Sequence, residues 1–173
     1  QLVEGGQFKV LASGRGGCRL PGDGFEYITL DIEVKEEVDQ VFDEYQPDVV
    51  IHGAAMTQVD DCELNQEACY RANVTATENL IQASERHNSH FIFVSTDFIF
   101  SGDKGPLDEL EEPSPVNYYG ETKLIGEQIL QKSKLNWAIA RTVLVYGIAH
   151  DMSRSNIILW VKKSLEMGKQ LKV

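Results

Sequence analysis

The chain has 173 residues, of which 42% are hydrophobic and 25% charged, a balance typical of one globular domain rather than of a disordered or fibrous protein. Acidic residues outnumber basic ones 27 to 16, which argues against a nucleic-acid partner, because phosphate backbones are bound by clustered lysine and arginine. Since no run of about 18 apolar residues and no secretory signal is present, we expect no membrane partner and a cytoplasmic location. The three cysteines and four histidines lack metal-ligand spacing, so no metal site is predicted.

The N-terminal part of the chain is predicted to alternate strands with a helix. Residues 8–13 and 26–30 have the composition of short strands, separated by a glycine-rich connection. Residues 34–45 place apolar side chains at helical spacing, with acidic side chains between them. Residues 48–52 form a nearly all-apolar strand, which we expect to be buried on both faces of a parallel sheet.

The same alternation continues to the C-terminal part. Helices are predicted at 65–86, 118–132 and 155–166, and strands at 91–94 and 137–141. Strands that alternate with helices indicate βαβ units. The predicted fold class is therefore α/β, with a Rossmann-type, doubly wound parallel sheet.

Tyr119 and Lys123 are the first candidate catalytic residues. Their spacing of four residues places both side chains on one helix face. An ammonium about 4 Å from the phenol favours the phenolate by about 4 kcal/mol, or roughly three pKa units, so we expect Lys123 to lower the pKa of Tyr119 and to make it a proton donor and acceptor near neutral pH. The alternative is an unrelated tyrosine and lysine on an exposed helix.

A second group of polar side chains favours the catalytic interpretation of Tyr119 and Lys123. The predicted strand at 91–94 runs directly into Ser95, Thr96 and Asp97. Open α/β sheets bind ligands at the carboxyl ends of their strands. A hydroxyl group there can donate a hydrogen bond to a substrate carbonyl as negative charge grows on its oxygen.

Four ordered stretches carry a resemblance to a known family. They are HGAAMTQVD at 52–60, STDFIF at 95–100, PVNYYGETK at 115–123 and RTVLVYG at 141–147. With these stretches the chain resembles the extended short-chain dehydrogenases/reductases, and most closely their dTDP-4-dehydrorhamnose reductase branch.

The resemblance implies roles for particular residues. It implies Thr96, Tyr119 and Lys123 as the catalytic set, with Lys123 also holding the nicotinamide ribose. The implied cofactor contacts are Asp31 and Ile32 on the adenine side, the turn Ala55, Met56 and Thr57, and Val94, Tyr119 and Lys123. The implied substrate contacts are Val59, Thr96, Asp97 and Leu144.

Two further residues have alternative interpretations. Arg15 follows the first predicted strand, where an arginine accommodates the extra phosphate of NADP and an acidic residue binds the ribose hydroxyls of NAD. It is equally an ordinary exposed loop arginine. Asn73 matches an asparagine common in extended members of the family, but a helix-interior polar group satisfied by local hydrogen bonds explains it as well.

The sequence departs from the family pattern in two places. The first strand and its glycine-rich phosphate turn are absent, although that strand normally lies in the middle of the sheet. Leu144 replaces the tryptophan that is typical of rhamnose-pathway reductases. We therefore expect residues 1–173 to form an NAD(P)-binding Rossmann domain truncated at both ends, with the C-terminal substrate-binding segment mostly absent.

The function that these features favour is reduction of a nucleotide-linked 4-keto-6-deoxy sugar. NADP(H) is the favoured cofactor and NAD(H) the alternative, the substrate is a small nucleotide sugar, and a homo-oligomer is compatible with the sequence. Two other functions stay open. One is a sugar-nucleotide epimerase or dehydratase of the same superfamily, and the other is a non-catalytic, cofactor-binding regulatory subunit.

Overall fold

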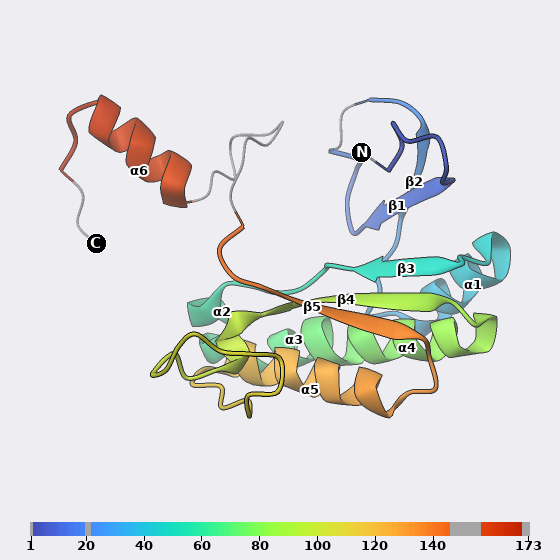
Figure 1. Ribbon diagram of the computed structural model, residues 1–173. Coiled ribbons are helices and arrows are strands. Elements are labelled where there is room, and N and C mark those ends of the chain that lie inside the picture. Colours follow the sequence, from blue (N-terminus) through green and yellow to red (C-terminus); the bar gives the residue numbers. More distant parts are fainter. Residues whose placement is uncertain (1, 20–21, 146–156, 171–173) are drawn as a thin grey trace.

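Five strands in parallel pairings form the framework of the part of the chain that the structure describes. The computed structural model describes residues 2–19, 22–145 and 157–170 (Figure 1). Its strands are β1 (Val10–Gly14), β2 (Phe25–Thr29), β3 (Val49–His52), β4 (His90–Thr96) and β5 (Trp137–Thr142). Each pairing is parallel, and helices connect β2 to β3, β3 to β4 and β4 to β5. The predicted α/β class with parallel strands is therefore confirmed.

The sheet is divided into two parts. β1 pairs with β2, while β4 lies between β3 and β5. No pairing joins β1 to β3 among the described strands, although these two strands face each other across the break (Figure 1). The break falls where the common Rossmann strand order, 3-2-1-4-5-6, places its first and central strand.

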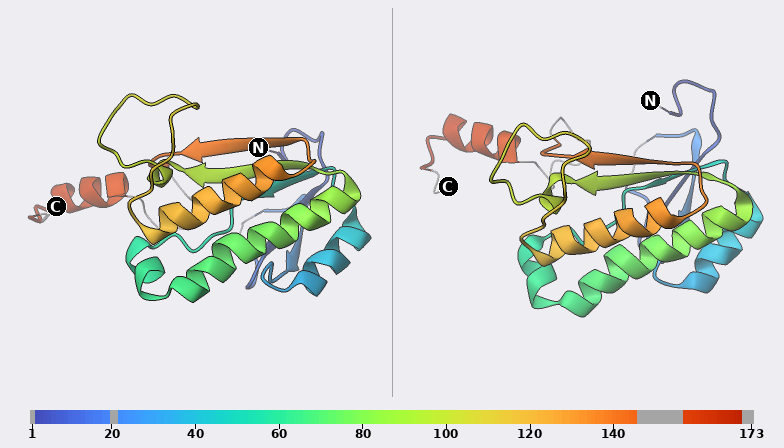
Figure 2. Two further views of the ribbon diagram at one scale, coloured as in Figure 1. Left: turned by 90° about the horizontal axis from the view of Figure 1, so that it is seen from below. Right: turned by 60° about the horizontal axis from the view of Figure 1, so that its bottom comes forward.

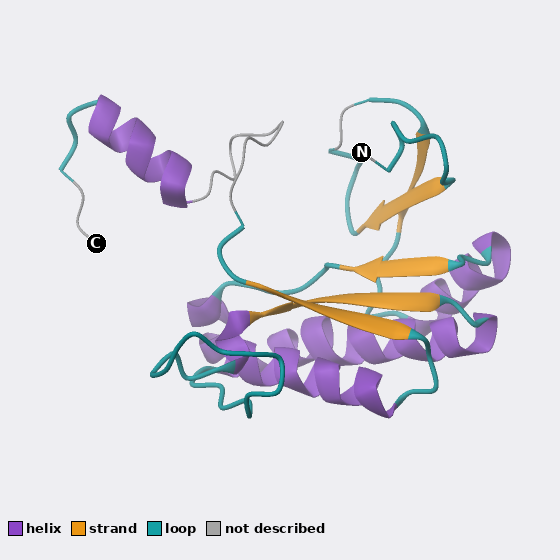
Figure 3. Cartoon of the chain, in the orientation of Figure 1, coloured by secondary structure: helices purple, strands orange, loops and turns teal. Residues whose placement is uncertain are grey.

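The helices are α1 (Lys35–Tyr45), α2 (Val59–Leu64), α3 (Gln66–Tyr70), α4 (Ala76–His87), α5 (Tyr118–Lys132) and α6 (Ile157–Glu166). A π-helical turn, Arg71–Thr75, connects α3 to α4, and a short 3-10 turn, Asp97–Ile99, follows β4. Helices α1, α4 and α5 cover one face of the sheet, with α4 between the other two (Figure 2). Figure 3 shows α6 away from this layer.

The core lies between the sheet and these three helices. Its fully buried centre includes Phe91 and Phe93, which alternate along β4, and Leu130 of α5. Gly126 brings α5 close to β4, since a Cβ atom there would lie 2.9 Å from the Phe93 ring. This packing fixes the start of α5 against the end of β4.

The structure corrects two predicted elements and adds a helix that was not predicted. The helix predicted at 65–86 contains the π-helical turn, and the sequence analysis missed α2 altogether. Strand β3 was expected to be buried on both faces, but Val49 and Ile51 are 47% and 55% exposed, because the packed helices cover the other face (Figure 2). The first two residues of the helix predicted at 155–166 lie outside the described residues.

Candidate active site at the carboxyl ends of the strands

The predicted site residues follow the carboxyl ends of the strands. The strands are parallel within each part of the sheet, and β1 and β3 point the same way across the break (Figure 1). Their carboxyl ends therefore lie along one edge, where open α/β sheets bind ligands. Arg15 follows β1, Asp31 and Ile32 follow β2, Ala55, Met56 and Thr57 follow β3, Thr96 ends β4 and Leu144 follows β5. The fold thus places residues from distant parts of the sequence along a common edge.

Tyr119 lies in the first turn of α5 and is 9% exposed. The N-cap residue Asn117 positions this turn, since its Oδ1 accepts a hydrogen bond from the Gly120 amide at 2.8 Å. Gly120 is required for the close approach, because a Cβ atom there would lie 2.2 Å from the Phe98 carbonyl oxygen. The start of the helix therefore sits directly on the turn that follows β4.

Thr96 is the last residue of β4, caps that turn and lies beside the tyrosine. Its hydroxyl accepts a hydrogen bond from the Phe98 amide at 3.2 Å and donates to Asp97 Oδ1 at 3.2 Å. Burial raises the pKa of Tyr119, and a hydrogen bond with the Thr96 hydroxyl opposes this increase. The arrangement gives a protonated phenol and a second hydroxyl at the end of one strand.

Lys123 is buried one turn further along α5, with 3% of its surface exposed. Its Nζ donates to the Val94 carbonyl oxygen at 2.8 Å and lies 4.0 Å from the centre of the Phe93 ring. Burial lowers the pKa of Lys123 to about 8, although the Glu127 carboxylate opposes this. His52 is itself buried, and its burial, together with the Lys123 charge, lowers the pKa of His52 to about 3, so this histidine is neutral.

The expectation that Lys123 lowers the pKa of Tyr119 is wrong for this structure. The pKa of Tyr119 is raised, with burial as the largest cause. The Lys123 ammonium interacts instead with Val94 and Phe93. Helical spacing alone places the two side chains on one face but does not set the direction of a long, flexible side chain.

The turn after β3 is held by Asn73 of the π-helical turn. Asn73 Oδ1 accepts a hydrogen bond from the Met56 amide at 2.7 Å, and its Nδ2 donates to the Met56 carbonyl at 3.0 Å. Nδ2 also lies 3.0 Å from Thr122 Oγ1, on the helix that carries the catalytic candidates. The purely local explanation of Asn73 is therefore wrong, and the sequence analysis omitted it from the site for lack of this spatial information.

Arg15 lies in an exposed cluster of charges at the other end of the edge. Its Nη1 is 3.0 Å from Glu33 Oε1, and Arg71 Nε is 3.5 Å from the other Glu33 oxygen. The side chain of Arg15 is 65% exposed. Asp31 is engaged locally, since its Oδ1 accepts from the Glu33 amide at 3.0 Å. Residue spacing alone does not predict that an acidic residue 18 positions away pairs with Arg15.

Among the predicted substrate contacts, Val59 packs near the catalytic candidates. It belongs with Met56 and Tyr118 to a cluster around the buried Cys62, Cys69 and Tyr119. Asp97 accepts the Thr96 hydrogen bond. Leu144 is 50% exposed beyond β5, and the last two residues of its motif, Tyr146 and Gly147, lie outside the described residues.

Sequence reasoning missed a buried ion pair that braces the site. Glu127 of α5, fully buried, accepts hydrogen bonds from Arg141 Nε and Nη2 at 3.1 and 2.8 Å. Arg141 Nη1 also donates to the Glu109 carbonyl at 3.3 Å. Glu127 lies four positions after Lys123 and therefore on the same helix face, but only the fold shows its partner.

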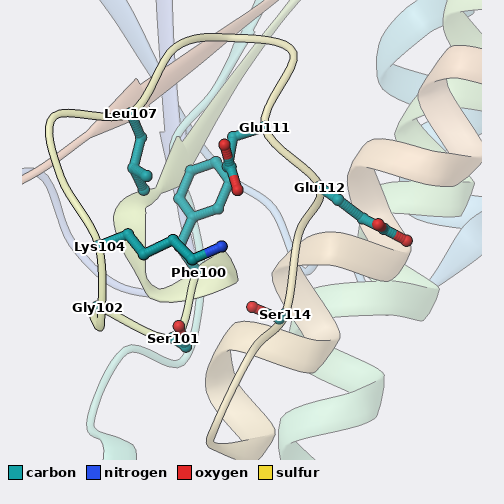
Figure 4. Close-up of a pocket in the computed structure, with 8 residues that line it drawn as sticks. All are labelled: Phe100, Ser101, Gly102, Lys104, Leu107, Glu111, Glu112 and Ser114. Carbon is teal, nitrogen blue, oxygen red and sulfur yellow. The ribbon is translucent and has the colours of Figure 1, made fainter.

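A separate small cavity lies in the long connection between β4 and α5. Its volume is about 60 Å³, and Figure 4 shows Lys104, Leu107 and Glu111 around the Phe100 ring. A cavity of this size has room for a few water molecules and is far below the 300–1,000 Å³ typical of ligand sites. It is therefore no candidate for the substrate site.

The described residues form neither a metal-binding cluster nor a membrane-spanning helix. No group of three or more His, Cys, Asp or Glu side chains is placed to hold a metal ion in this part of the chain. Within the same ranges, every helix is too short or too polar to cross a membrane.

Sequence comparisons identify relatives over most of the chain. The family model described as the RmlD substrate-binding domain matches residues 3–173. The dTDP-4-dehydrorhamnose reductase of Aggregatibacter actinomycetemcomitans is 35% identical over 147 residues, which cover 84% of this chain and 46% of that protein. Methionine adenosyltransferase 2 subunit beta of Rattus norvegicus is 32% identical over 147 residues, covering 85% and 43%. The chain thus spans about half the length of these relatives.

Solved structures share the fold. A dTDP-4-dehydrorhamnose reductase from Bacillus anthracis, in complex with NADP, has a TM-score of 0.76 and 28% identity, covering 92% of this chain and 60% of that one. A UDP-glucose 4-epimerase from Brucella ovis, in complex with NAD, has a TM-score of 0.77 and 25% identity, covering 84% and 47%. By its match to the RmlD family model over residues 3–173 and by its parallel α/β fold, the chain belongs to the RmlD family of the extended short-chain dehydrogenases/reductases.

Proposed function

We propose that the chain carries the cofactor-binding and catalytic residues of an NADP-preferring reductase that acts on a nucleotide-linked 4-keto-6-deoxy sugar. The observation that carries the proposal is the placement of Thr96, Tyr119 and Lys123 at the junction of β4 and α5, where all three side chains are buried hydrogen-bond donors. The reductase relative at 35% identity supports the substrate class.

The residues along the strand edge fit a dinucleotide. Gly53 and Ala54 follow β3, are exposed and have small side chains, so a ligand can approach the backbone there. Arg15 and Lys123 place positive charges near opposite ends of the edge, where a ribose phosphate and the nicotinamide ribose would bind. When bound, the reduced nicotinamide supplies a hydride for the keto carbon.

Tyr119 acts as the general acid. As the keto carbon is reduced, its oxygen becomes an alkoxide, and the O–H bond of Tyr119 breaks as the proton moves to that oxygen. The raised pKa of Tyr119 keeps the phenol protonated at neutral pH, which is the form that a proton donor needs. Thr96 orients the same oxygen through its hydroxyl, and the phenolate is reprotonated from solvent.

Lys123 serves as a neighbouring cation and a contact for the ribose hydroxyls. Because the pKa of Lys123 is about 8, the protonated, charged form of its side chain predominates at neutral pH. Its position on Val94 and Phe93 leaves it 3% exposed. On cofactor binding, the ribose hydroxyls would therefore replace the Val94 carbonyl as the hydrogen-bond partner of Lys123 Nζ.

Arg15 supplies the preference for NADP over NAD. A 2′-phosphate would compete with Glu33 for the Arg15 guanidinium, and a second arginine, Arg71, adjoins the same carboxylate. One charge-assisted phosphate contact contributes about 1.5–3 kcal/mol, a preference on the order of tenfold or more. The NADP complex of the Bacillus anthracis relative supports this assignment.

The break in the sheet bears on pyrophosphate binding. We propose that a further parallel strand, ending in a glycine-rich phosphate turn, pairs between β1 and β3. The unpaired facing edges of those two strands and the position of the central Rossmann strand support this. A helix N-terminus after such a turn would provide the amides that meet the pyrophosphate.

The test is a steady-state assay that follows NADPH absorbance with the full protein and a dTDP-linked 4-keto-6-deoxy sugar. We expect oxidation of NADPH that depends on the sugar. Conversion of a UDP-sugar without net change in NADPH would identify an epimerase instead, the alternative favoured by the Brucella ovis fold match.

A regulatory subunit is the second candidate, because the chain is 32% identical to a protein named as a subunit of methionine adenosyltransferase. Cofactor binding without turnover of any keto sugar would favour that candidate. Retention of both hydroxyl groups and the lysine favours the reductase.

A further inference from the structure

Two buried asparagines lie on the helical segment that runs through the middle of the helix layer. Asn73 is 1% exposed and Asn79 is 7% exposed. They are six positions apart, roughly 9 Å along a helix axis. Their segment, the π-helical turn and α4, packs against α5 on one side and α1 on the other (Figure 2). The two side-chain amides make their hydrogen bonds on opposite sides of this segment.

Asn73 faces the catalytic side. It satisfies both backbone polar groups of Met56 and lies within hydrogen-bond distance of Thr122, the residue before Lys123. One side chain thereby joins the turn after β3 to the helix that carries the catalytic candidates. A π-helical turn at this point is an irregularity that often accompanies function.

Asn79 faces the other side of α4. Its Nδ2 donates to the carbonyl of Ile32 at 3.0 Å and lies 3.3 Å from that of Glu33. These carbonyls belong to the loop after β2, whose Glu33 pairs with Arg15. The second asparagine thus holds the loop at the expected adenine end of the site.

We infer that Asn73 and Asn79 are positioning residues that set the two cofactor-facing loops independently, one at the nicotinamide end and one at the adenine end. Neither side chain needs to touch the cofactor. Each fixes a loop backbone from behind, and the rigid helix between them sets the spacing of the two loops. The inference rests on the proposed binding of a dinucleotide.

A general structural role makes a different prediction from this one. If the asparagines only stabilised the fold, their removal would weaken all ligands alike. Independent positioning instead predicts that a ligand with only the adenine end detects the loss of Asn79 but not the loss of Asn73.

The experiment measures binding of NADPH and of adenosine 2′,5′-bisphosphate to the full protein by calorimetry. For Asn79→Ala we expect both ligands to weaken by the same factor, about tenfold. For Asn73→Ala we expect NADPH to weaken by about tenfold and the bisphosphate to keep its affinity. Asn65→Ala is the matched control, because Asn65 is exposed and donates only to a carbonyl four residues away.

Thr122→Val tests the same contact in case the Asn73→Ala variant does not fold. It removes the hydroxyl on α5 that Asn73 contacts but leaves the Met56 hydrogen bonds, so it should weaken NADPH by a smaller factor and leave the bisphosphate unchanged. Equal effects of Asn73→Ala and Asn79→Ala on both ligands, or no effect of either, would overturn the inference. A wild-type protein that binds neither ligand would overturn the proposed function itself.

Discussion

The two ends of the candidate site are built in different ways. At the catalytic end, Tyr119 and Lys123 are 9% and 3% exposed and are braced by buried hydrogen bonds and by the Glu127–Arg141 pair. At the adenine end, Arg15, Glu33 and Arg71 form ion pairs whose arginine side chains are 65% and 51% exposed. Water screens the second set and not the first.

This difference indicates how each end should respond to change. Buried, close-packed groups have one geometry, and small displacements of them affect catalysis strongly. Exposed ion pairs contribute little and depend on salt. We therefore expect large, salt-independent effects at the catalytic end and modest, salt-dependent effects at the adenine end.

The largest effect is expected for Tyr119→Phe. The substitution removes one hydroxyl and keeps the ring that packs on Phe98, so folding and cofactor affinity should change little. Turnover should fall by about 10² to 10⁴, the usual contribution of a general acid. Steady-state kinetics of the purified variant measure this, and retention of more than about a tenth of wild-type turnover would assign the proton to another group.

Gly120→Ala should cause the second largest loss of turnover. A methyl group would lie 2.2 Å from the Phe98 carbonyl, so α5 must shift away from the end of β4 and carry Tyr119 with it. A displacement of about 1 Å costs on the order of 10² in turnover. Gly17→Ala at the adenine end is the control, because nothing lies within 4 Å of its added methyl group. Equal turnover of the two variants would show that the catalytic end is not closely packed.

Lys123→Met should reduce both turnover and cofactor affinity but stabilise the fold. Lowering the lysine pKa from 10.5 to about 8 means that the folded state disfavours the ammonium at neutral pH, by up to ~3 kcal/mol. The unfolded chain binds the extra proton between about pH 8 and 10.5, so wild-type stability should rise with pH in that window.

Urea unfolding at several pH values tests this prediction. The variant should be more stable than wild type at pH 7 by about 1–3 kcal/mol. Its free energy of unfolding should not increase between about pH 8 and 10.5, as that of wild type should. Lys132→Met, at an exposed position of the same helix, should show neither change. A variant less stable than wild type at neutral pH would mean that the buried ammonium is well compensated.

The smallest effects are expected at the adenine end. Arg15→Ala should weaken NADPH by about tenfold relative to NADH. Glu33→Gln should strengthen NADPH a few-fold, because it removes the carboxylate that competes for Arg15. Both effects should shrink as salt rises above the physiological range, where the Debye length falls below about 8 Å. Effects that do not depend on salt would show that this end, too, is desolvated.

Much of the fold could be predicted from local patterns. The boundaries of α1 and α5 agree with the sequence to within one residue. Apolar residues at helical spacing mark α1, and the N-cap residue Asn117 marks the start of α5. The helix α2 was missed because six residues, VDDCEL, are too few to show a period. The exposed face of β3 was missed because an apolar strand does not reveal which helices cover it.

The sequence by itself determined the alternation of strands and helices and the order of the motifs, because these depend on side chains close together along the chain. The tertiary structure decided which side chains meet. It turned Asn73 toward Met56, paired Arg15 with Glu33 across 18 positions, and directed Lys123 to Val94 rather than to Tyr119. Such contacts depend on how separate elements pack and on the burial that packing creates, and neither quantity is encoded in residue spacing.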